Sequence, residues 1–459
     1  MLWGGRFSKK PKEALLEFNS GENVTLDSRL VTYDILGSVA HVKMLKKQGI
    51  LQAKEADEIL NALKQIYKKS ENGEFELTKD LEDVHTAVEN AVTKITSNGK
   101  NMHIARSRND QVLLDMRMYM RDEIINLLEI ISSMQEALTK LSKKDSVFPA
   151  YTHTRIAQPI TLSFYCDSYV KSLDRDKGRL MDCYKRVNQN PLGAGAVAGT
   201  SWNIDRKYTT ELLGFESVQE NALDTISSRG EMEAEFVFAL SMVMMKLSKI
   251  SEELIWLSQK GLVIIPDDYC TGSSMMPNKK NADFLELIRG RTARIYGNLM
   301  HILITLKGTP SGYNSDSQET KYALLSAINT TTLAIQIMAD VLPKLEINES
   351  KVKEELEQGF SQATEIADLL VKKGIPFRDS HKLVGELIQY CESKGKVFGQ
   401  TSSTEANKIM NVKLSEKEWI ATTSLLRERL KTKITFQKSD FAENEKRKLE
   451  KIGQNLIGA

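Results

Sequence analysis

Apolar side chains recur at helical spacing along three long stretches of the chain. After Glu233 the interval alternates between four and three residues, at Phe236, Leu240, Val243, Leu247, Ile250, Leu254 and Leu257. This alternation is a heptad seam over three repeats, as in helices that pack along their length. Similar spacing follows Ser107 as far as Leu141, and it recurs from about Ala282 to Lys307. The pattern therefore predicts three long helices.

Proline placement supports this interpretation. Helix interiors exclude proline because it lacks the N–H and clashes with the preceding turn. The chain has no proline between Pro11 and Pro149, between Pro191 and Pro266, or after Pro376. No stretch combines alternating apolar and polar residues with the turns of a β-hairpin. We therefore predict an all-α fold built on long bundle helices.

Polar, glycine-bearing segments separate the predicted helices, at residues 97–111, 149–161, 190–206 and 266–283. The sequence Ser107-Arg-Asn-Asp110 fits a variant capping box, in which the serine hydroxyl accepts a hydrogen bond from a free N–H at the helix start. Long helices place their connections at the ends of a bundle, where binding and catalytic residues concentrate. We expect the functional site in these segments.

Composition narrows the class of protein. The 459 residues are 41% hydrophobic and 27% charged, as in an ordinary globular protein. Lys and Arg (63) nearly balance Asp and Glu (61), and this net charge of +2 argues against a nucleic-acid binder. The apolar run from Phe236 to Met245 ends at Lys246, short of the ~20 residues of a membrane span. With no secretory signal after Met1, we expect a cytoplasmic protein without a membrane partner.

The cysteines exclude two further classes of site. Cys166, Cys183, Cys270 and Cys391 are far apart and form no C-x-x-C pair. This spacing matches neither a common metal site nor a disulfide framework, so we expect reduced thiols and no metal.

The loop from Thr271 to Asp283 carries the most chemical groups. Gly272 permits unusual backbone angles, and Pro277 prevents a continuous helix. Two hydroxyls directly follow Gly272, and two lysines and Asn281 lie within the next seven positions. Such a loop can present a hydroxyl, backbone N–H groups and ammonium charge to a bound carboxylate. From composition alone, the alternative is a solvated polar loop that binds nothing.

This loop resembles the signature of the fumarase/aspartase superfamily, Gly-Ser-Ser-x-Met-Pro-x-Lys-x-Asn, without a gap from Gly272 to Asn281. Two further blocks resemble the argininosuccinate lyase branch, Ala105-Arg-Ser-Arg-Asn-Asp-Gln111 and Thr152-His-Thr-Arg-Ile-Ala-Gln-Pro159. Shorter matches to that branch are Leu2-Trp-Gly-Gly-Arg-Phe7, Glu82-Asp-Val-His85 and Gly374-Ile-Pro-Phe-Arg378. The resemblance covers nearly the whole chain.

The resemblance implies a fold, an assembly and a reaction. The fold would have three mostly helical domains, at residues 1–106, at 107–355 (the long-helix bundle, with the signature loop at 271–283) and at 356–459. The assembly would be a homotetramer with a central multi-helix bundle, in which three subunits build each active site. The reaction would be the reversible elimination of argininosuccinate to arginine and fumarate in arginine biosynthesis, with no cofactor.

The implied reaction builds up negative charge next to a carboxylate, so fixed cations and N–H donors matter most. By resemblance, Ser273 is the base, Lys279 stabilises the developing charges, and His153 is an acid/base group supported by Glu286. The sequence does not decide between Ser273 and His153 as the base, and we favour Ser273. The resemblance places substrate-binding or supporting residues at Asn23, Asp27, Asp83, His85, Ser107, Arg108, Asn109, Thr152, Asn281, Tyr313, Gln318 and Lys321. Taken singly, each of these residues could have a structural role instead, for example as a packed histidine. Their occurrence together, in the order found in the family, favours a substrate-binding role.

Some positions depart from the pattern of the branch. Asn23 replaces the usual serine, Ser315 replaces the usual basic residue, and Arg229-Gly-Glu231 stands where Asp-Arg-Asp is usual. The first two changes fall on the leaving-group side of the implied site. The sequence therefore predicts the release of fumarate more firmly than the identity of the amine that is released with it. A related lyase acting on another N-succinyl amine is one alternative. A structural protein of the lens-crystallin kind is another, and it is opposed by the retention of Ser273, Lys279, His153 and Glu286.

Overall fold

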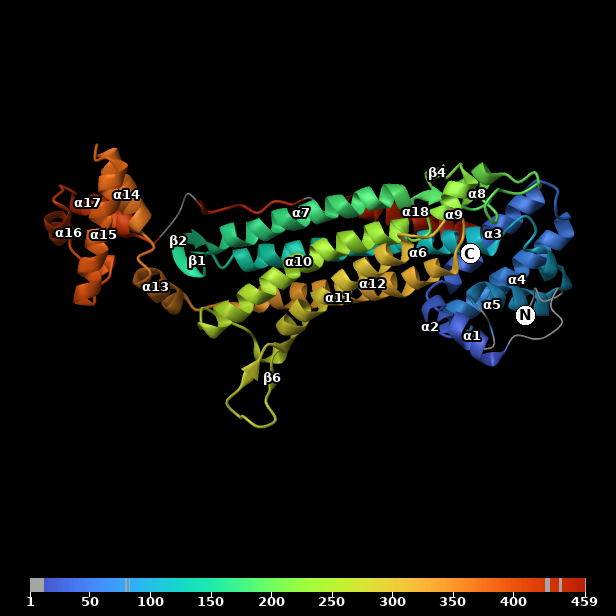
Figure 1. Cartoon of the computed structure of the whole chain (residues 1–459), viewed down its shortest axis with the longest axis horizontal. Coiled ribbons are helices and arrows are strands. Elements are labelled where there is room, and N and C mark those ends of the chain that lie inside the picture. Colours follow the sequence, from blue (N-terminus) through green and yellow to red (C-terminus); the bar gives the residue numbers. More distant parts are fainter. Residues whose placement is uncertain (1–11, 79–80, 82, 426–429, 437–439, 459) are drawn as a thin grey trace.

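A computed structural model describes residues 12–78, 81, 83–425, 430–436 and 440–458. The sequence matches at residues 2–7 and at Glu82 lie outside these residues, as do the side chains of Leu16 and Asn23. The molecule is elongated, with a long helix bundle joining a helical N-terminal part at one end to a small helical part at the other (Figure 1). The described residues are mostly helical, which confirms the all-α prediction.

The bundle consists of helices that run along one another, α6 (Arg108–Ser142), α7 (Leu162–Val187), α10 (Glu231–Gln259), α11 (Asp283–Leu306) and α12 (Glu319–Val341). Helix α6 begins where the capping sequence predicts. Ser107 Oγ accepts a hydrogen bond from Asn109 N at 3.3 Å, and Asp110 Oδ1 accepts one from Ser107 N at 2.9 Å. The 35 residues of α6 make it about 50 Å long at 1.5 Å per residue.

The heptad seam of α10 faces the interior of a single chain. Its seven residues, from Phe236 to Leu257, are at most 3% exposed and pack in the core with α7, α11 and α12. Lys246, which interrupts the apolar run, is also buried and donates from Nζ to Asp176 Oδ1 on α7 at 2.8 Å. The seam is therefore covered within one chain.

Shorter helices gather at the two ends of the bundle. The N-terminal end holds α1 (Glu13–Ser20), α2 (Asn23–Asp27), α3 (Val31–Lys47), α4 (Ala53–Glu71), α5 (Val84–Ile95) and the 3-10 turn η1 (Ser97–Asn101). At the other end, α13 (Glu349–Gln358) lies beside the bundle. Beyond it is a small cluster with its own apolar core, made of α14 (Ala363–Lys372), α15 (Phe377–Lys394), η5 (Phe398–Gln400), α16 (Ser403–Met410) and α17 (Glu416–Thr423).

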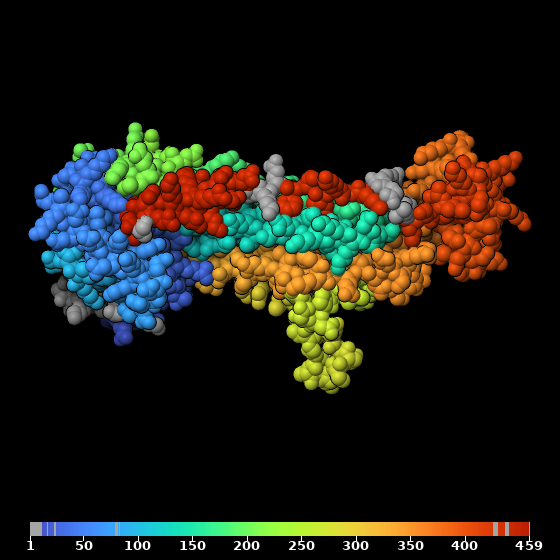
Figure 2. Space-filling view, turned by 180° about the vertical axis from the view of Figure 1, so that it is seen from behind, coloured from blue at the N-terminus to red at the C-terminus, as the bar shows by residue number. Residues whose placement is uncertain are grey.

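The end of the chain returns to the N-terminal part. Thr432 N, in an extended segment along α7, donates to Ser163 Oγ at 3.1 Å. Helix α18 (Asp440–Ile457) then packs on α3, α6 and α8 (Arg206–Leu213), and Tyr184 OH donates to Glu445 Oε2 at 2.7 Å. Figure 2 shows this last helix, in red, against the blue N-terminal helices. The division into three domains at residues 106 and 355 stays a prediction.

The strands are short, and one hairpin differs from the prediction. In the 149–161 segment, β1 (Val147–Thr152) and β2 (Arg155–Thr161) pair antiparallel. The other described pairs have two residues per strand, β3 (Gln189–Asn190) with β4 (Ser217–Val218), β5 (Val263–Ile264) with β8 (Glu346–Ile347), and β6 (Thr271–Gly272) with β7 (Lys280–Asn281). The remaining short elements are α9 (Ala222–Ser227), η2 (Asp267–Tyr269), η3 (Ser315–Gln318) and η4 (Leu342–Lys344).

One described stretch, Ser315–Lys344, is long and apolar enough to cross a membrane by length and composition. It contains α12, and 56% of its most apolar window is buried inside the chain. Leu324, Ile328 and Ile335 of this helix are at most 2% exposed and belong to the main core. The stretch therefore has the character of a core helix in a bundle.

Candidate active site

The predicted site residues form three groups on different parts of the chain (Figure 1). The first lies where the N-terminal helices meet the starts of α6 and α12, and we call it the N-terminal cluster, namely Asp27, Asp83, His85, Arg108, Asn109, Tyr313, Gln318 and Lys321. The second is the turn between β1 and β2, with Thr152 and His153. The third is the signature loop, residues 271–283, which extends from β6 through β7.

Two partners from α5 hold Arg108 in the first turn of α6. Its guanidinium forms an ion pair with Asp83 and donates from Nη2 to Thr86 Oγ1 at 2.8 Å. Asp83 also caps α5, because its Oδ1 accepts a hydrogen bond from Thr86 N at 2.8 Å. Burial alone would raise the pKa of Asp83, but His85 and Arg108 lower it below its ordinary value. Asp83 is therefore ionised and fixes the orientation of Arg108.

Lys321 and Asp27 form a buried ion pair, with side chains 7% and 1% exposed. Lys321 lies in the first turn of α12, and Asp27 ends α2. The second oxygen of Asp27 accepts a hydrogen bond from Val84 N at 3.2 Å, at the start of α5. One turn before Lys321, Gln318 Nε2 donates to Tyr313 OH at 2.7 Å. The ion pair thus joins α2, α5 and α12 at one point.

A buried polar network supports His85. Its Nδ1 lies 2.8 Å from Asp34 Oδ1 and 3.5 Å from Asp115 Oδ2, and Gln111 Nε2 donates to Asp34 Oδ1 at 2.5 Å. Burial alone would raise the pKa of Asp34, but the neighbouring His85 lowers it. Burial and the charge of Asp34 raise the pKa of Asp115 well above its ordinary value. The surroundings therefore favour the negative charge on Asp34 and oppose it on Asp115.

The same three side chains are the one group among the described residues with spacing suited to a metal ion. Ligand atoms of Asp34, His85 and Asp115 lie within 4.8 Å of one another. However, the Gln111 amide donates to the same carboxylate, and Arg106 lies close enough to lower the pKa of both carboxyl groups. These donors already offset part of the carboxylate charge. The group is better described as a hydrogen-bonded network that orients His85.

Asp110 connects a glycine loop to the start of α6. Its Oδ2 accepts hydrogen bonds from Gly193 N and Gly195 N, both at 2.9 Å. Both glycines have positive φ, a conformation that costs them no steric clash. In the same loop, Ala196 O accepts a hydrogen bond from Asn109 Nδ2 at 3.2 Å. Two adjacent side chains of α6 therefore fix this loop beside the N-terminal cluster.

The turn between β1 and β2 has an unusual backbone. Because Thr152 pairs with Arg155, His153 and Thr154 form a two-residue hairpin turn, with φ of 49° and 60°. Turns with two positive φ values ordinarily use Asn-Gly, and a β-branched threonine is unfavourable there. Such conformations cost about 1–3 kcal/mol per residue and cluster at functional sites. His153 is exposed, and it lies in a turn whose backbone conformation is unfavourable for the sequence His-Thr.

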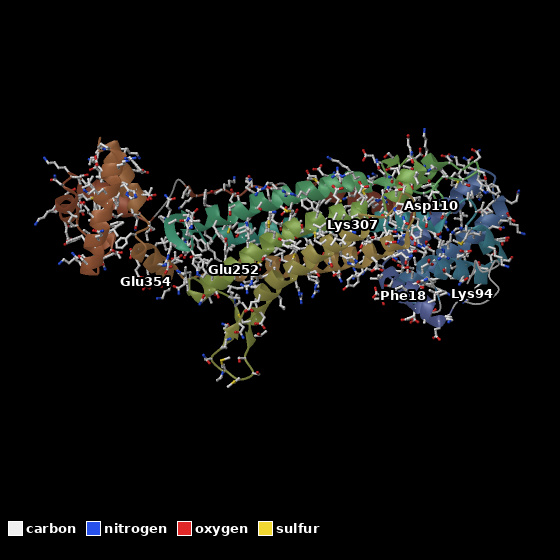
Figure 3. The ribbon with its side chains drawn as sticks, in the orientation of Figure 1. Phe18, Lys94, Asp110, Glu252, Lys307 and Glu354 are labelled. Atoms are coloured by element: carbon white, nitrogen blue, oxygen red, sulfur yellow. The ribbon has the colours of Figure 1, made fainter. Side chains whose placement is uncertain are left out.

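The signature loop stands away from the bundle as an exposed hairpin (Figure 3). Ser273 Oγ accepts hydrogen bonds from Met275 N at 3.3 Å and Met276 N at 3.1 Å. Two N–H donors on one hydroxyl oxygen favour negative charge on that oxygen, as an alkoxide base requires. Lys279 and Glu286 are exposed. The loop gives Ser273 local donors, while its charged side chains face solvent.

Within a single chain, the N-terminal cluster lies far from the other two groups. Helix α6 begins at Arg108 and ends just before the hairpin that carries His153, which separates them by about 50 Å. Helix α11 covers 24 residues, about 36 Å, between the signature loop and the segment with Tyr313. Among the described residues, no hydrogen bond or ion pair joins His153 to Glu286. Both distances exceed the length of a small substrate several times over.

Comparison with known proteins identifies the class. A family model described as Lyase matches residues 5–297. The crystal structure of EDDS lyase in complex with formate has a TM-score of 0.76 and 26% identity, covering 98% of this chain and 97% of that one. A class II fumarase from Schistosoma mansoni shares the fold, with a TM-score of 0.72 and 17% identity over 88% of this chain and 90% of that one. The chain is a lyase of the fumarase/aspartase type.

Within this class, the chain belongs to the argininosuccinate lyase family. A model of the argininosuccinate lyase C-terminal region matches residues 360–438. The argininosuccinate lyase of Syntrophus aciditrophicus is 45% identical over 408 residues, 88% of this chain and 86% of the relative. That of Acinetobacter baumannii is 46% identical over 392 residues, 84% of this chain and 82% of the relative. The family predicted from the sequence is confirmed.

Sequence reasoning missed the residues that support the predicted site. Gln111 and Asp115 follow Arg108 by three and seven residues, which places them on one face of α6. That spacing could have indicated them as partners of His85. Asp34 has no comparable signal, because it comes from α3 and reaches the network only through the packing of α3 on α6.

Proposed function

We propose that this chain catalyses the reversible elimination of argininosuccinate to arginine and fumarate, without a cofactor, as a step of arginine biosynthesis in the cytoplasm. The observation that carries the proposal is the 45% identity to the Syntrophus aciditrophicus argininosuccinate lyase over 88% of this chain. The signature loop is complete in this sequence, and the hydrogen bonds to Ser273 suit a base.

In the proposed mechanism, the Ser273 alkoxide removes a proton from the succinyl carbon next to the carbon that bears nitrogen. The electron pair of that C–H bond spreads into the adjacent carboxylate and then forms the C=C bond of fumarate as the C–N bond breaks. The leaving nitrogen takes the C–N electron pair and a proton from His153, and Glu286 orients the imidazole. Lys279 and the loop N–H groups stabilise the negative charge, which is the main barrier.

The binding residues divide between the two halves of the substrate. We assign Arg108, Asn109, Thr152 and Asn281 to the carboxylates of the succinyl half, because they offer a guanidinium, amides and a hydroxyl. Tyr313, Gln318, Lys321 and Asp27 are assigned to the amino-acid half. Asn23 belongs to the same half by sequence, and Ser107, Asp83 and His85 support Arg108 and its surroundings.

An assembly of chains would close the distances between the three groups. Helix α11 exposes large apolar side chains, each 43–54% accessible, at Tyr296, Met300, Leu303 and Ile304. At 3.6 residues per turn these four positions lie on one side of the helix, and exposed apolar surface of this kind marks contacts between proteins. We propose a homotetramer in which these faces meet. Each site would then combine a signature loop, a hairpin turn and an N-terminal cluster from three different chains.

The test is to mix the purified protein with argininosuccinate, follow fumarate by its ultraviolet absorbance and quantify arginine in parallel. The proposal requires equal amounts of both products. If a folded oligomer released no fumarate, the proposed substrate would be wrong, and other N-succinyl amines would be assayed next.

A further inference from the structure

The residue at position 315 raises a question about charge in the site. Position 315 is a serine; by the resemblance described above, a basic side chain is usual there, so the proposed site has one cation fewer on the amino-acid side. Free arginine and the corresponding half of argininosuccinate carry an α-carboxylate, and a carboxylate that leaves water needs a charged or N–H partner. The question of which side chain supplies that partner rests on the proposed function.

Arg229 lies on the ring of Tyr313. It occupies the turn between α9 and α10, and its guanidinium carbon is 5.4 Å from the centre of the Tyr313 ring. The Gly312 N–H donates to Ser227 Oγ at 2.8 Å, which joins this turn to the segment before η3. Gly230 has φ of 94°, and a Cβ there would lie 2.6 Å from Leu306 Cδ1. The hydrogen bond to the Ser227 hydroxyl, and a glycine that permits close approach, therefore place Arg229 at the N-terminal cluster.

Arg229 differs from its cationic neighbours in its partners. The charges of Arg108 and Lys321 are matched by Asp83 and Asp27. No carboxylate oxygen of the residues that the structure describes forms an ion pair with the Arg229 guanidinium within 4.0 Å. Burial lowers the pKa of Arg229, although Tyr313 and nearby acidic groups act in the opposite direction. Its charge is thus partly removed from water without a direct counter-ion.

We propose that Arg229 binds the α-carboxylate of the amino-acid half of argininosuccinate and supplies the charge that Ser315 lacks. A guanidinium can lie on an aromatic face and still offer its N–H edge to both oxygens of a carboxylate. Lys321 is unsuited to this role because it is buried against Asp27. Lys307 is exposed one residue beyond α11 and serves as a matched control (Figure 3).

The first test measures binding without catalysis. Titration calorimetry compares L-arginine with agmatine, which is arginine without its α-carboxylate. The full-length protein should bind arginine more tightly than agmatine, and Arg229→Gln should weaken arginine binding about 10- to 100-fold, as expected for a lost charge-assisted hydrogen bond. Agmatine binding should not change. Arg229→Lys should recover part of the difference, and Lys307→Gln should behave like the wild type.

Two results would overturn the proposal. If Arg229→Gln weakened arginine and agmatine equally, Arg229 would only support the structure of the site. If it changed neither, the carboxylate would bind elsewhere. Melting temperatures of all variants identify any that fail to fold, and Arg229→Lys then provides the comparison. The rate of fumarate release from argininosuccinate by the wild type is measured separately, so a failed substrate assignment is distinguished from a failed assignment of Arg229.

Discussion

Mixing two inactive variants tests whether the active site is shared between chains. Ser273→Ala removes the proposed base from the signature loop, and His153→Asn removes the proposed acid from the hairpin turn. Each purified variant alone should be nearly inactive, because every site in the proposed tetramer would lack one of the two groups. The variants are then combined in equal amounts under conditions that allow subunits to exchange.

The expected recovery follows from the proposed assembly, in which Ser273 and His153 reach one site from different chains. Arg108 and His153 are separated by the length of α6, about 50 Å, and the signature loop lies about 36 Å from the Tyr313 segment along α11. In a mixed tetramer, the chain that supplies Ser273 to a site is intact at that residue with a chance of one half, and the same holds for the different chain that supplies His153. Both residues are then intact in one quarter of the sites. Random exchange in a closed symmetric tetramer should therefore restore about one quarter of the wild-type activity.

Fumarate absorbance measures this recovery, and two affinity tags on the variants prove that mixed tetramers have formed. As a control, the double variant Ser273→Ala/His153→Asn is mixed with Ser273→Ala. This mixture has no intact Ser273 and should stay inactive. If tagged mixed tetramers of the two single variants recovered no activity, Ser273 and His153 would have to come from the same chain. The proposed site built from three chains would then be refuted.

Three further predictions concern buried charges. Lys246→Met should lower the free energy of unfolding by about 3 kcal/mol in a urea titration, because the buried Asp176 keeps its charge and only the partly exposed Arg179 as a partner. The double variant Lys246→Met/Asp176→Leu should recover most of this loss. Burial and the charge of Arg106 lower the pKa of His41 to about 3, so between pH 6.5 and 3 the unfolded chain binds a proton that the folded chain does not. Stability should fall by about 1.4 kcal/mol per pH unit over this window as the pH drops, and His41→Gln should reduce that slope. Asp27→Asn should lower kcat/KM at least tenfold and destabilise the protein, since Lys321 becomes an unpaired buried cation, and unchanged kinetics would exclude a role for this ion pair.

Much of the bundle could be predicted because its signals are local. The capping sequence at Ser107 and the absence of proline gave the start and the length of α6, and apolar spacing gave α10 and α11. The sequence of a helix does not show which other helices its apolar seam contacts. The α10 seam has the same spacing whether it faces its own chain or another, and only the structure shows that it faces α7, α11 and α12. The return of α18 to the N-terminal part also has no signal in its sequence.

The site was predictable as a set of residues but not as an arrangement. The signature loop was found from its pattern, yet the hairpin at His153 was missed because His-Thr is a poor sequence for a turn with two positive φ values. Arg229 was noted only as a departure from a pattern. Its contact with Tyr313 depends on Gly230 and on a hydrogen bond between distant turns, which no spacing in the sequence reveals.

The most direct test of the account compares the wild type with Ser273→Ala on argininosuccinate, with melting temperature and oligomer size measured in parallel. The account predicts that the wild type releases fumarate and arginine in equal amounts. It also predicts that Ser273→Ala loses about three or more orders of magnitude in kcat while its tetramer and melting temperature stay nearly unchanged. A folded Ser273→Ala variant that kept most of its activity would contradict the assignment of the signature loop as the source of the base.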